Sequence, residues 1–171
     1  GLDGDPPRPT DAAWTTALLV GLGLSLVGDL LLLSRARPYF LAGLFAFLAG
    51  HLAYVVAFAS RGLAGAGAIV AAPLLVAGLA AVIRWLLPHV RGSMRGPVIA
   101  YMLVISLMAL AAAATCAHRA TWTIPVGAAM FYLSDVSVAL DRFVAPGFVH
   151  RAWGLPLYYG GQLLLAWSVS A

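Results

Sequence analysis

The sequence has no lysine and no glutamate, so its positive side chains are all arginine, apart from histidine, and its negative side chains are all aspartate. Charged residues make up only 9% of the 171 residues, compared with about 25% in an ordinary soluble domain, and 63% are hydrophobic. A soluble protein of this composition would lack the polar surface needed to cover its core. The composition therefore excludes an ordinary soluble domain and predicts a multi-spanning membrane protein.

Cysteine is also scarce, and the common catalytic and ligand-binding motifs are missing. The single cysteine, Cys116, excludes an internal disulfide, and its apolar surroundings predict a buried, inert thiol. The motifs HExxH, CxxC and GxSxG are absent, as is a glycine-rich phosphate loop before a helix. The net charge of +4 does not indicate nucleic-acid binding, because the arginines stand singly between apolar blocks, as loop charges do at a membrane.

Six apolar blocks are long enough to cross a bilayer, which takes about 20 residues of helix. They cover residues 12–34, 39–60, 64–87, 97–117, 121–141 and 152–170. Pro38, Pro88 and Pro97 mark predicted helix edges, and the short connections require neighbouring helices to be antiparallel. We expect an all-α, polytopic transmembrane bundle with six spans. It forms a single domain at residues 12–171, after a polar, proline-rich tail or loop at residues 1–11 that is not a signal peptide.

Arginine is unevenly divided between the two ends of this predicted bundle. The first, third and fifth connections hold Arg35, Arg37, Arg91, Arg95, Arg142 and Arg151. The opposite end holds Arg8, Arg61 and Arg119. Because cytoplasmic loops are enriched in arginine, we expect the odd-numbered connections to be cytoplasmic and both ends of this chain to be outside. The expected location is a bacterial plasma (inner) membrane.

Three ionisable residues lie well within the predicted spans, namely Asp29, His51 and Asp135. A carboxylate in a membrane helix costs about 3 kcal/mol on insertion scales and normally faces the bundle interior. At about 1.5 Å of rise per residue, both aspartates lie roughly 7–9 Å below the arginine-rich face, although they come from different helices. This shared depth predicts one site with Asp29 and Asp135 as its catalytic residues. The alternative for each is a pairing with an arginine or a backbone cap.

Other polar residues are spaced to share helix faces with one another or with Asp135, because positions three or four apart lie on one face of a helix. Arg142 lies two helical turns after Asp135, nearer the cytoplasm, where it can meet a phosphate group. The candidate substrate-binding residues are His51, Tyr54, Tyr132, Asp141, Arg142, Tyr158 and Gln162. Simpler alternatives are an interhelical hydrogen bond for His51, packing for the tyrosines, and solvation or a local ion pair for Asp141.

Four segments in chain order carry a resemblance to a known family. They are Gly28-Asp29, FAFLAGHLAYVVAF with His51 and Tyr54, SDVSVALDRF, and YYGGQLLLA with Gln162. Together they resemble the YhhN-like integral membrane family, with SDxxxALDRF as the most specific block. Members of that family usually carry about eight helices, two of which precede the Gly-Asp helix and include a Lys-Pro pair. This chain has neither those helices nor a lysine, so no role of that lysine is assigned here.

The resemblance implies an activity, because the characterised members of this family are lysoplasmalogenases. These enzymes hydrolyse the vinyl ether of a lysoplasmalogen to a fatty aldehyde and glycerophospho-ethanolamine or -choline. Protonation of the β-carbon creates an oxocarbenium ion, to which water adds, and Asp29 and Asp135 can divide the acid and base tasks in either order. No metal or organic cofactor is expected. The expected partners are a lysophospholipid substrate and the lipid bilayer, without nucleic acid, and the oligomeric state stays open.

Two alternative functions would use the same polar residues within the predicted spans. A lipid or small-solute transporter or binding protein would use it for recognition, although the sequence shows no clear pair of repeats. A metal-dependent lipid amidase or hydrolase would use Asp29, His51 and Asp135 as a two-carboxylate, one-histidine ligand set, which no ligand spacing supports. A purely structural subunit is disfavoured, because its interior would not need two carboxylates.

Overall fold

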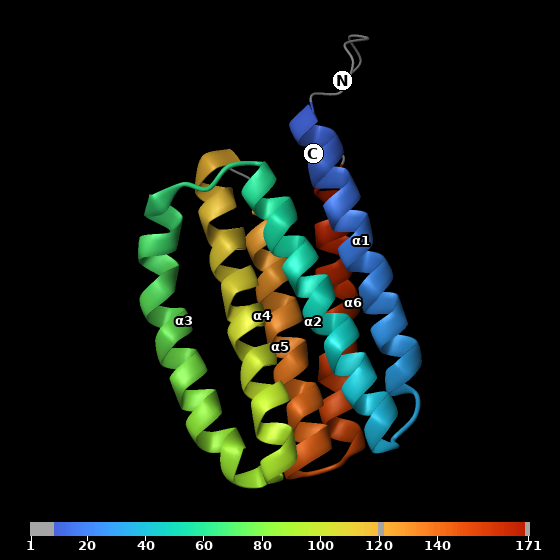
Figure 1. Cartoon of the computed structure of the whole chain (residues 1–171). Helices are drawn as coiled ribbons and strands as arrows, with labels where there is room; N and C mark the ends of the chain where they lie inside the picture. The colour runs from blue at the N-terminus through green and yellow to red at the C-terminus, as the bar shows by residue number, and fades with distance from the viewer. Residues whose placement is uncertain (1–8, 120–121, 170–171) are drawn as a thin grey trace.

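The computed structural model describes residues 9–119 and 122–169, which form a bundle of six α-helices (Figure 1). These are α1 (Pro9–Leu32), α2 (Arg37–Ser60), α3 (Gly65–Leu86), α4 (Gly92–Arg119), α5 (Thr123–Ala139) and α6 (Phe148–Trp167). A 3₁₀ turn, η1, covers Leu87–His89, and a π-helical turn, η2, covers Leu140–Val144. The described ranges contain no strand, which confirms the predicted all-α bundle.

Five of the described helices are long and apolar enough to cross a membrane, so the chain is a multi-pass membrane protein. The five ranges are Ala12–Leu32, Arg37–Ser60, Gly65–His89, Gly92–Thr115 and Thr123–Val144. The last helix, α6, lies outside this set although it packs along α5. The sixth span therefore stays a prediction.

Proline positions agree with the predicted helix edges in two places and disagree in a third. Pro38 and Pro88 occupy the first turns of α2 and η1, where their missing N–H groups cost nothing. Pro97, predicted as a helix edge, lies inside α4, which already begins at Gly92. The helix tolerates Pro97 because a proline removes only one backbone bond, close to the helix start. Likewise α1 begins at Pro9, within the predicted tail.

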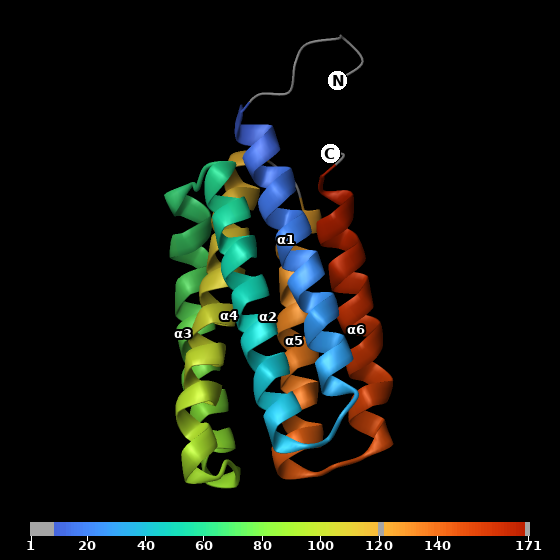
Figure 2. The same cartoon turned by 45° about the vertical axis from the view of Figure 1, so that its right-hand side comes forward.

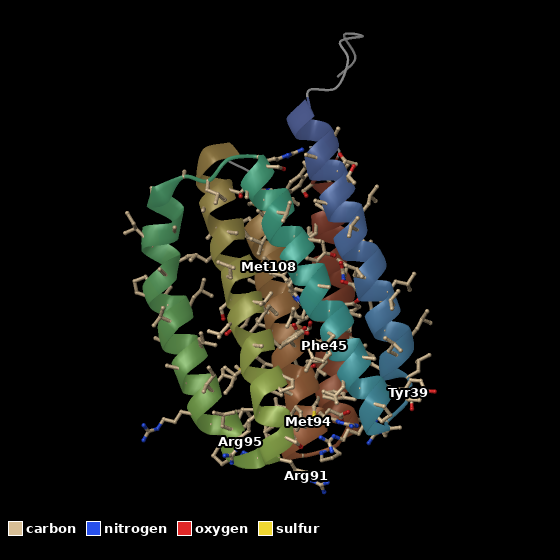
Figure 3. All side chains as sticks on the ribbon, in the orientation of Figure 1. Tyr39, Phe45, Arg91, Met94, Arg95 and Met108 are labelled. Carbon is tan, nitrogen blue, oxygen red and sulfur yellow. The ribbon has the colours of Figure 1, made fainter. Side chains whose placement is uncertain are left out.

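Neighbouring helices are antiparallel, as predicted. The connections after α1, α3 and α5 gather at one end, and the connection after α2 lies at the other, together with the last turn of α4 and the first turn of α5 (Figure 1). Figure 3 shows Arg91 and Arg95 at the first of these ends, which we call the arginine-rich end. The side chains of Arg8 and Arg119, and that of Cys116, lie outside the described residues. The orientation in the membrane stays a prediction.

Glycines set the spacing of two helix pairs. A Cβ atom added to Gly161 of α6 would lie 2.8 Å from the carbonyl oxygen of Gly127 of α5. A Cβ atom on Gly50 of α2 would lie 3.2 Å from the carbonyl oxygen of Gly21 of α1. Backbones therefore approach closely in both pairs, as is typical of small residues at membrane helix contacts. In contrast, α3 packs mainly against α4 at the edge of the bundle (Figures 1 and 2).

Buried apolar side chains form two clusters. The aromatic cluster surrounds the middle of α5, and its larger members are Trp14, Leu18, Phe47, Tyr54, Phe58, Tyr101, Ile105, Met108, Ile124, Phe131, Tyr158 and Leu165. The arginine-end cluster consists of Phe40, Leu86, Val90, Met94, Val98 and Met102. Figure 3 shows Met108 of the first and Met94 of the second at different heights along the bundle. Residues of both clusters line the cavity of the candidate site.

Candidate functional site

A cavity of about 490 Å³ lies among the helices, and both Asp29 and Asp135 line it. All six helices contribute to its walls, which are mostly apolar. Arg35, Asp141, Arg142 and Arg151 line it from the arginine-rich end. The structure therefore brings the two carboxylates to a common chamber of the size that usually holds a small ligand.

The carboxylate of Asp29 ends a chain of hydrogen bonds that crosses between helices. The hydroxyl of Tyr158 on α6 donates to Oδ2 of Asp29 at 2.8 Å. Nε2 of Gln162 donates to the Tyr158 hydroxyl at 3.2 Å, and the hydroxyl of Tyr54 on α2 donates to Oε1 of Gln162 at 2.7 Å. Tyr158 and Gln162 are four residues apart, so they share the face of α6 that was predicted from their spacing.

The carboxylate of Asp135 has a different set of partners. The hydroxyl of Tyr101 on α4 donates to Oδ2 of Asp135 at 2.6 Å. Nε2 of His51 lies 3.7 Å from the same oxygen and has no hydrogen-bond partner, although the ring is only 1% exposed. Nδ1 of His51 is 2.6 Å from the carbonyl oxygen of Phe47, which can only accept, so Nδ1 carries a hydrogen.

Phe131 of α5 contacts both sets of partners. Its ring is fully buried and makes T-shaped contacts with His51 at 4.7 Å and with Tyr158 at 5.1 Å between ring centroids. The ring of His51 also meets Tyr101 at 5.3 Å. Edge-to-face contacts of this kind favour particular ring orientations. The aromatic cluster thereby fixes the side chains that hold both carboxylates.

The arginine-rich end of the cavity is built by η2, the π-helical turn that follows α5. In this turn the backbone N–H of Ala145 donates to the carbonyl oxygen of Leu140 at 2.9 Å, five residues back. The guanidinium of Arg142 lies over the ring of Phe40, 4.3 Å from its centroid, and donates to the backbone carbonyl oxygen of Arg35 at 3.0 Å. Single π turns are frequent at functional sites.

Asp141 has partners other than its sequence neighbour. Its Oδ1 accepts the backbone N–H of Gly147 at 2.8 Å, and its Oδ2 lies 3.7 Å from Nη2 of Arg35. The ion pair therefore joins two connections of the chain that are distant in sequence. An adjacent pair with Arg142, the alternative considered from the sequence, is not the one observed.

The structure divides the predicted site residues into two groups. Those that line the cavity are Asp29, Tyr132, Asp135, Asp141, Arg142 and Tyr158. His51, Tyr54 and Gln162 lie outside the cavity lining. His51 and Gln162 contact the lining residues Asp135 and Tyr158, and Tyr54 is connected to the lining through Gln162. Among the side chains that the structure describes, those of residues 12–115 and 122–169, no three histidine, cysteine or acidic residues come together as a metal-binding group, so the alternative set of Asp29, His51 and Asp135 is not assembled.

Tyr101 is the functional candidate that sequence reasoning missed. It stands in an apolar stretch with no polar residue three or four positions away, so helix-face spacing does not single it out. The predicted depth of Tyr101 in the membrane would have identified it as a candidate. Tyr101 is four residues into the predicted span at 97–117, roughly 6 Å below the arginine-rich face, close to the level expected for the two aspartates.

Comparisons with known proteins cover nearly the whole chain. The sequence pattern of the YhhN family matches residues 7–169. Over 159 residues the chain is 31% identical to the lysoplasmalogenase TMEM86A of Bos taurus and 33% identical to that of Homo sapiens. Each match covers 90% of this chain and 65% of the relative, so the chain spans less than two thirds of the length of these proteins. No solved structure matches this chain.

Proposed function

This chain belongs to the YhhN family, and from this premise we propose that it is a membrane-embedded hydrolase that cleaves the vinyl ether bond of lysoplasmalogens. The observation that carries the proposal is the meeting of Asp29 and Asp135 in one largely apolar cavity. Both relatives described above are named lysoplasmalogenases, which supports the same chemistry. The proposed products are a fatty aldehyde and glycerophospho-ethanolamine or -choline.

Two carboxyl groups provide what vinyl ether hydrolysis needs. One delivers a proton to the β-carbon, and the resulting oxocarbenium ion is stabilised by the negative charge of the other. The ionised group then accepts a proton from the water that adds to the cation. A low-dielectric cavity strengthens each of these electrostatic interactions, because little water competes for the charges.

The shape and charge of the cavity suit a single-chain phospholipid. In the proposed arrangement, the guanidinium of Arg142 binds the phosphate at the arginine-rich end, and Asp141 helps to position the headgroup. The vinyl ether, which lies just below the headgroup, then reaches the level of the two aspartates. The hydrocarbon chain would leave the level of the aspartates sideways, toward α3 and α4, where Val82, Val98 and Met102 line the cavity.

The remaining candidates would orient the substrate and the water. Tyr132 and Tyr158 line the cavity, so they would contact bound groups directly. His51, Tyr54 and Gln162 would act through the residues they contact. The proposal also places the protein in a bacterial plasma membrane with its arginine-rich end in the cytoplasm, as the arginine bias favours.

The test is an assay of the detergent-purified protein with a lysoplasmalogen and with its saturated alkyl-ether analogue. We expect fatty aldehyde from the vinyl ether only. Asp29→Asn and Asp135→Asn should each lower kcat by about 10²–10⁴-fold, the usual contribution of an acid–base group. Asp11→Asn, the same chemical change in the first turn of α1, serves as the control and should leave aldehyde release unchanged.

Two results would overturn the proposal. Near-normal aldehyde release by both variants would remove the aspartates from the reaction. Tight binding of the lipid by the wild-type protein without any aldehyde would instead favour the alternative function, that of a lipid-binding or transport protein.

A further inference from the structure

The hydrogen bonds around the two carboxyl groups differ in direction, and this difference locates a proton. In the chain of hydrogen bonds that ends at Asp29, every donor points toward Asp29. Tyr54 donates to Gln162, Gln162 donates to Tyr158, and Tyr158 donates to Asp29. An ionised carboxylate can only accept, so it satisfies the end of such a chain. Successive bonds also polarise one another, which strengthens the last donation to Asp29.

Asp135 faces an acceptor as well as a donor. The hydrogen on Nδ1 of His51 is bound by the carbonyl oxygen of Phe47, so a neutral imidazole presents the lone pair of Nε2 toward Asp135. That buried nitrogen has no other partner. A protonated carboxyl group on Asp135 provides the missing donor after a small movement of the two side chains. A carboxylate there would instead face a lone pair at 3.7 Å.

Burial decides between this arrangement and a charged pair. An imidazolium on His51 facing an ionised Asp135 carries the same total number of protons as a neutral His51 facing a protonated Asp135. Separating the charges in this way would place an imidazolium that is only 1% exposed against the rings of Phe131 and Tyr101, beside a carboxylate that is 16% exposed. Desolvation of the imidazolium there is costly, and a contact of 3.7 Å with the carboxylate is too long to compensate for that cost. The neutral pair is therefore favoured.

We propose that Asp135 carries the proton that starts the reaction, that Asp29 is its ionised partner, and that Tyr101 and His51 are positioning residues for Asp135. The division of roles rests on the function proposed above. Both residues face Oδ2 of Asp135: the hydroxyl of Tyr101 donates to it, and Nε2 of His51, which lies 3.7 Å away, would accept its hydrogen.

With this assignment, every proton that is released in the reaction is also taken up. Asp135 gives its proton to the β-carbon, and the electron pair of the C=C bond forms the new C–H bond. Water adds to the oxocarbenium carbon and loses a proton to Asp29, which gives a neutral hemiacetal. Asp29 then protonates the departing glycerol oxygen while Asp135 takes the hydroxyl proton of the hemiacetal. Aldehyde and alcohol leave, and both residues return to their starting states.

Infrared spectroscopy of the protein without substrate tests the assignment directly. The chain has only six aspartates and no glutamate, so few carboxyl groups contribute to the spectrum. At neutral pH we expect one absorption from a protonated carboxyl group, lost in Asp135→Asn and retained in Asp29→Asn. Its loss in Asp29→Asn only, or its absence from the wild-type protein, would overturn the proposal. Since no turnover is involved, this result is independent of whether lysoplasmalogen is the substrate.

A tyrosine pair provides a second test that does not depend on the folding of the aspartate variants. Removing the hydroxyl in Tyr101→Phe should shift the frequency of the protonated carboxyl absorption and lower kcat about tenfold with little change in KM. The matched variant Tyr158→Phe removes a donor to Asp29 and should leave that absorption where it is. An unshifted absorption in Tyr101→Phe, or a shift produced by Tyr158→Phe alone, would contradict the proposed position of the proton.

Discussion

The aromatic cluster and the arginine-end cluster line the same cavity but are built from different kinds of side chain. The first holds rings in edge-to-face contact, and three of them are tyrosines whose hydroxyls belong to the hydrogen bonds of the two aspartates. The second contains valine, leucine, methionine and one phenylalanine, without a polar side chain. Methionine is flexible and polarisable, so it adapts to irregular neighbours.

This contrast teaches how one cavity can serve two purposes. A tyrosine buries a large ring and still delivers a hydroxyl to a fixed position, which suits the control of carboxyl groups. Valine and methionine walls make contacts without direction, which suits a hydrocarbon chain of variable length. We expect substitutions in the aromatic cluster to change stability and turnover, and those near the arginine-rich end to change substrate affinity and preference.

The largest expected effect comes from Phe131→Ala. Loss of this buried ring should lower the free energy of unfolding by about 3–5 kcal/mol and release His51 and Tyr158 from their fixed orientations. Thermal denaturation in detergent, with aldehyde release on the folded fraction, measures both consequences. Phe131→Leu keeps much of the volume and should recover most of the stability but not the turnover. Full turnover in Phe131→Leu would show that ring geometry does not hold the carboxyl groups.

The next effect tests whether the aromatic cluster depends on the fixed spacing of α5 and α6. Gly161→Val would press its side chain against the backbone of Gly127 and should cost about 1–3 kcal/mol of stability. It should also reduce turnover, because Tyr158 would move away from Asp29. Gly78→Val on α3 is the control, since a Cβ atom there meets nothing within 4 Å. Equal destabilisation by the two changes, measured by thermal denaturation, would refute this dependence.

A substitution at the arginine-rich end should act on affinity. Arg142→Ala removes charge-assisted hydrogen bonds to a phosphate, each worth about 1.5–3 kcal/mol, so KM should rise roughly 10–100-fold with kcat little changed. Steady-state kinetics with a lysoplasmalogen give both values. Arg91→Ala is the control, because Arg91 is at the same end but does not line the cavity. A fall in kcat at constant KM would contradict a headgroup role.

The smallest effect should appear in the choice of chain length. Val98→Phe narrows the part of the cavity beside the arginine-end cluster. For each methylene that no longer fits, kcat/KM should fall about fourfold, as expected from about 0.8 kcal/mol per buried methylene. A series of lysoplasmalogens of increasing chain length measures this change, with Ile69→Phe on the exposed face of α3 as the control. An unaltered preference for chain length would show that the hydrocarbon chain of the substrate does not lie beside Val98.

The sequence predicted most of the fold, because long apolar blocks and short connections determine helices and their antiparallel order. It also predicted a shared depth for Asp29 and Asp135, because the depth of a residue follows from its distance in sequence from the end of its own helix. It did not predict the partner of Asp141, because Arg35 approaches from a distant connection. Tyr101 was missed for a related reason, since contacts between α4 and α5 depend on helix rotation, which an almost uniformly apolar helix does not reveal.

The π turn at the end of α5 has a consequence for how this segment tolerates change. One residue more than an α-helical turn is accommodated between Ser134-Asp135 and the loop that follows. Deleting one residue from Leu140–Val144 would remove the wide turn and restore α-helical winding, so the side chains within the turn would change the face of the helix that they occupy. Arg142 would leave Phe40, and Asp141 would lose Gly147. Length in this segment is therefore as strictly constrained as residue identity, and an insertion or deletion here should be more damaging than most single substitutions.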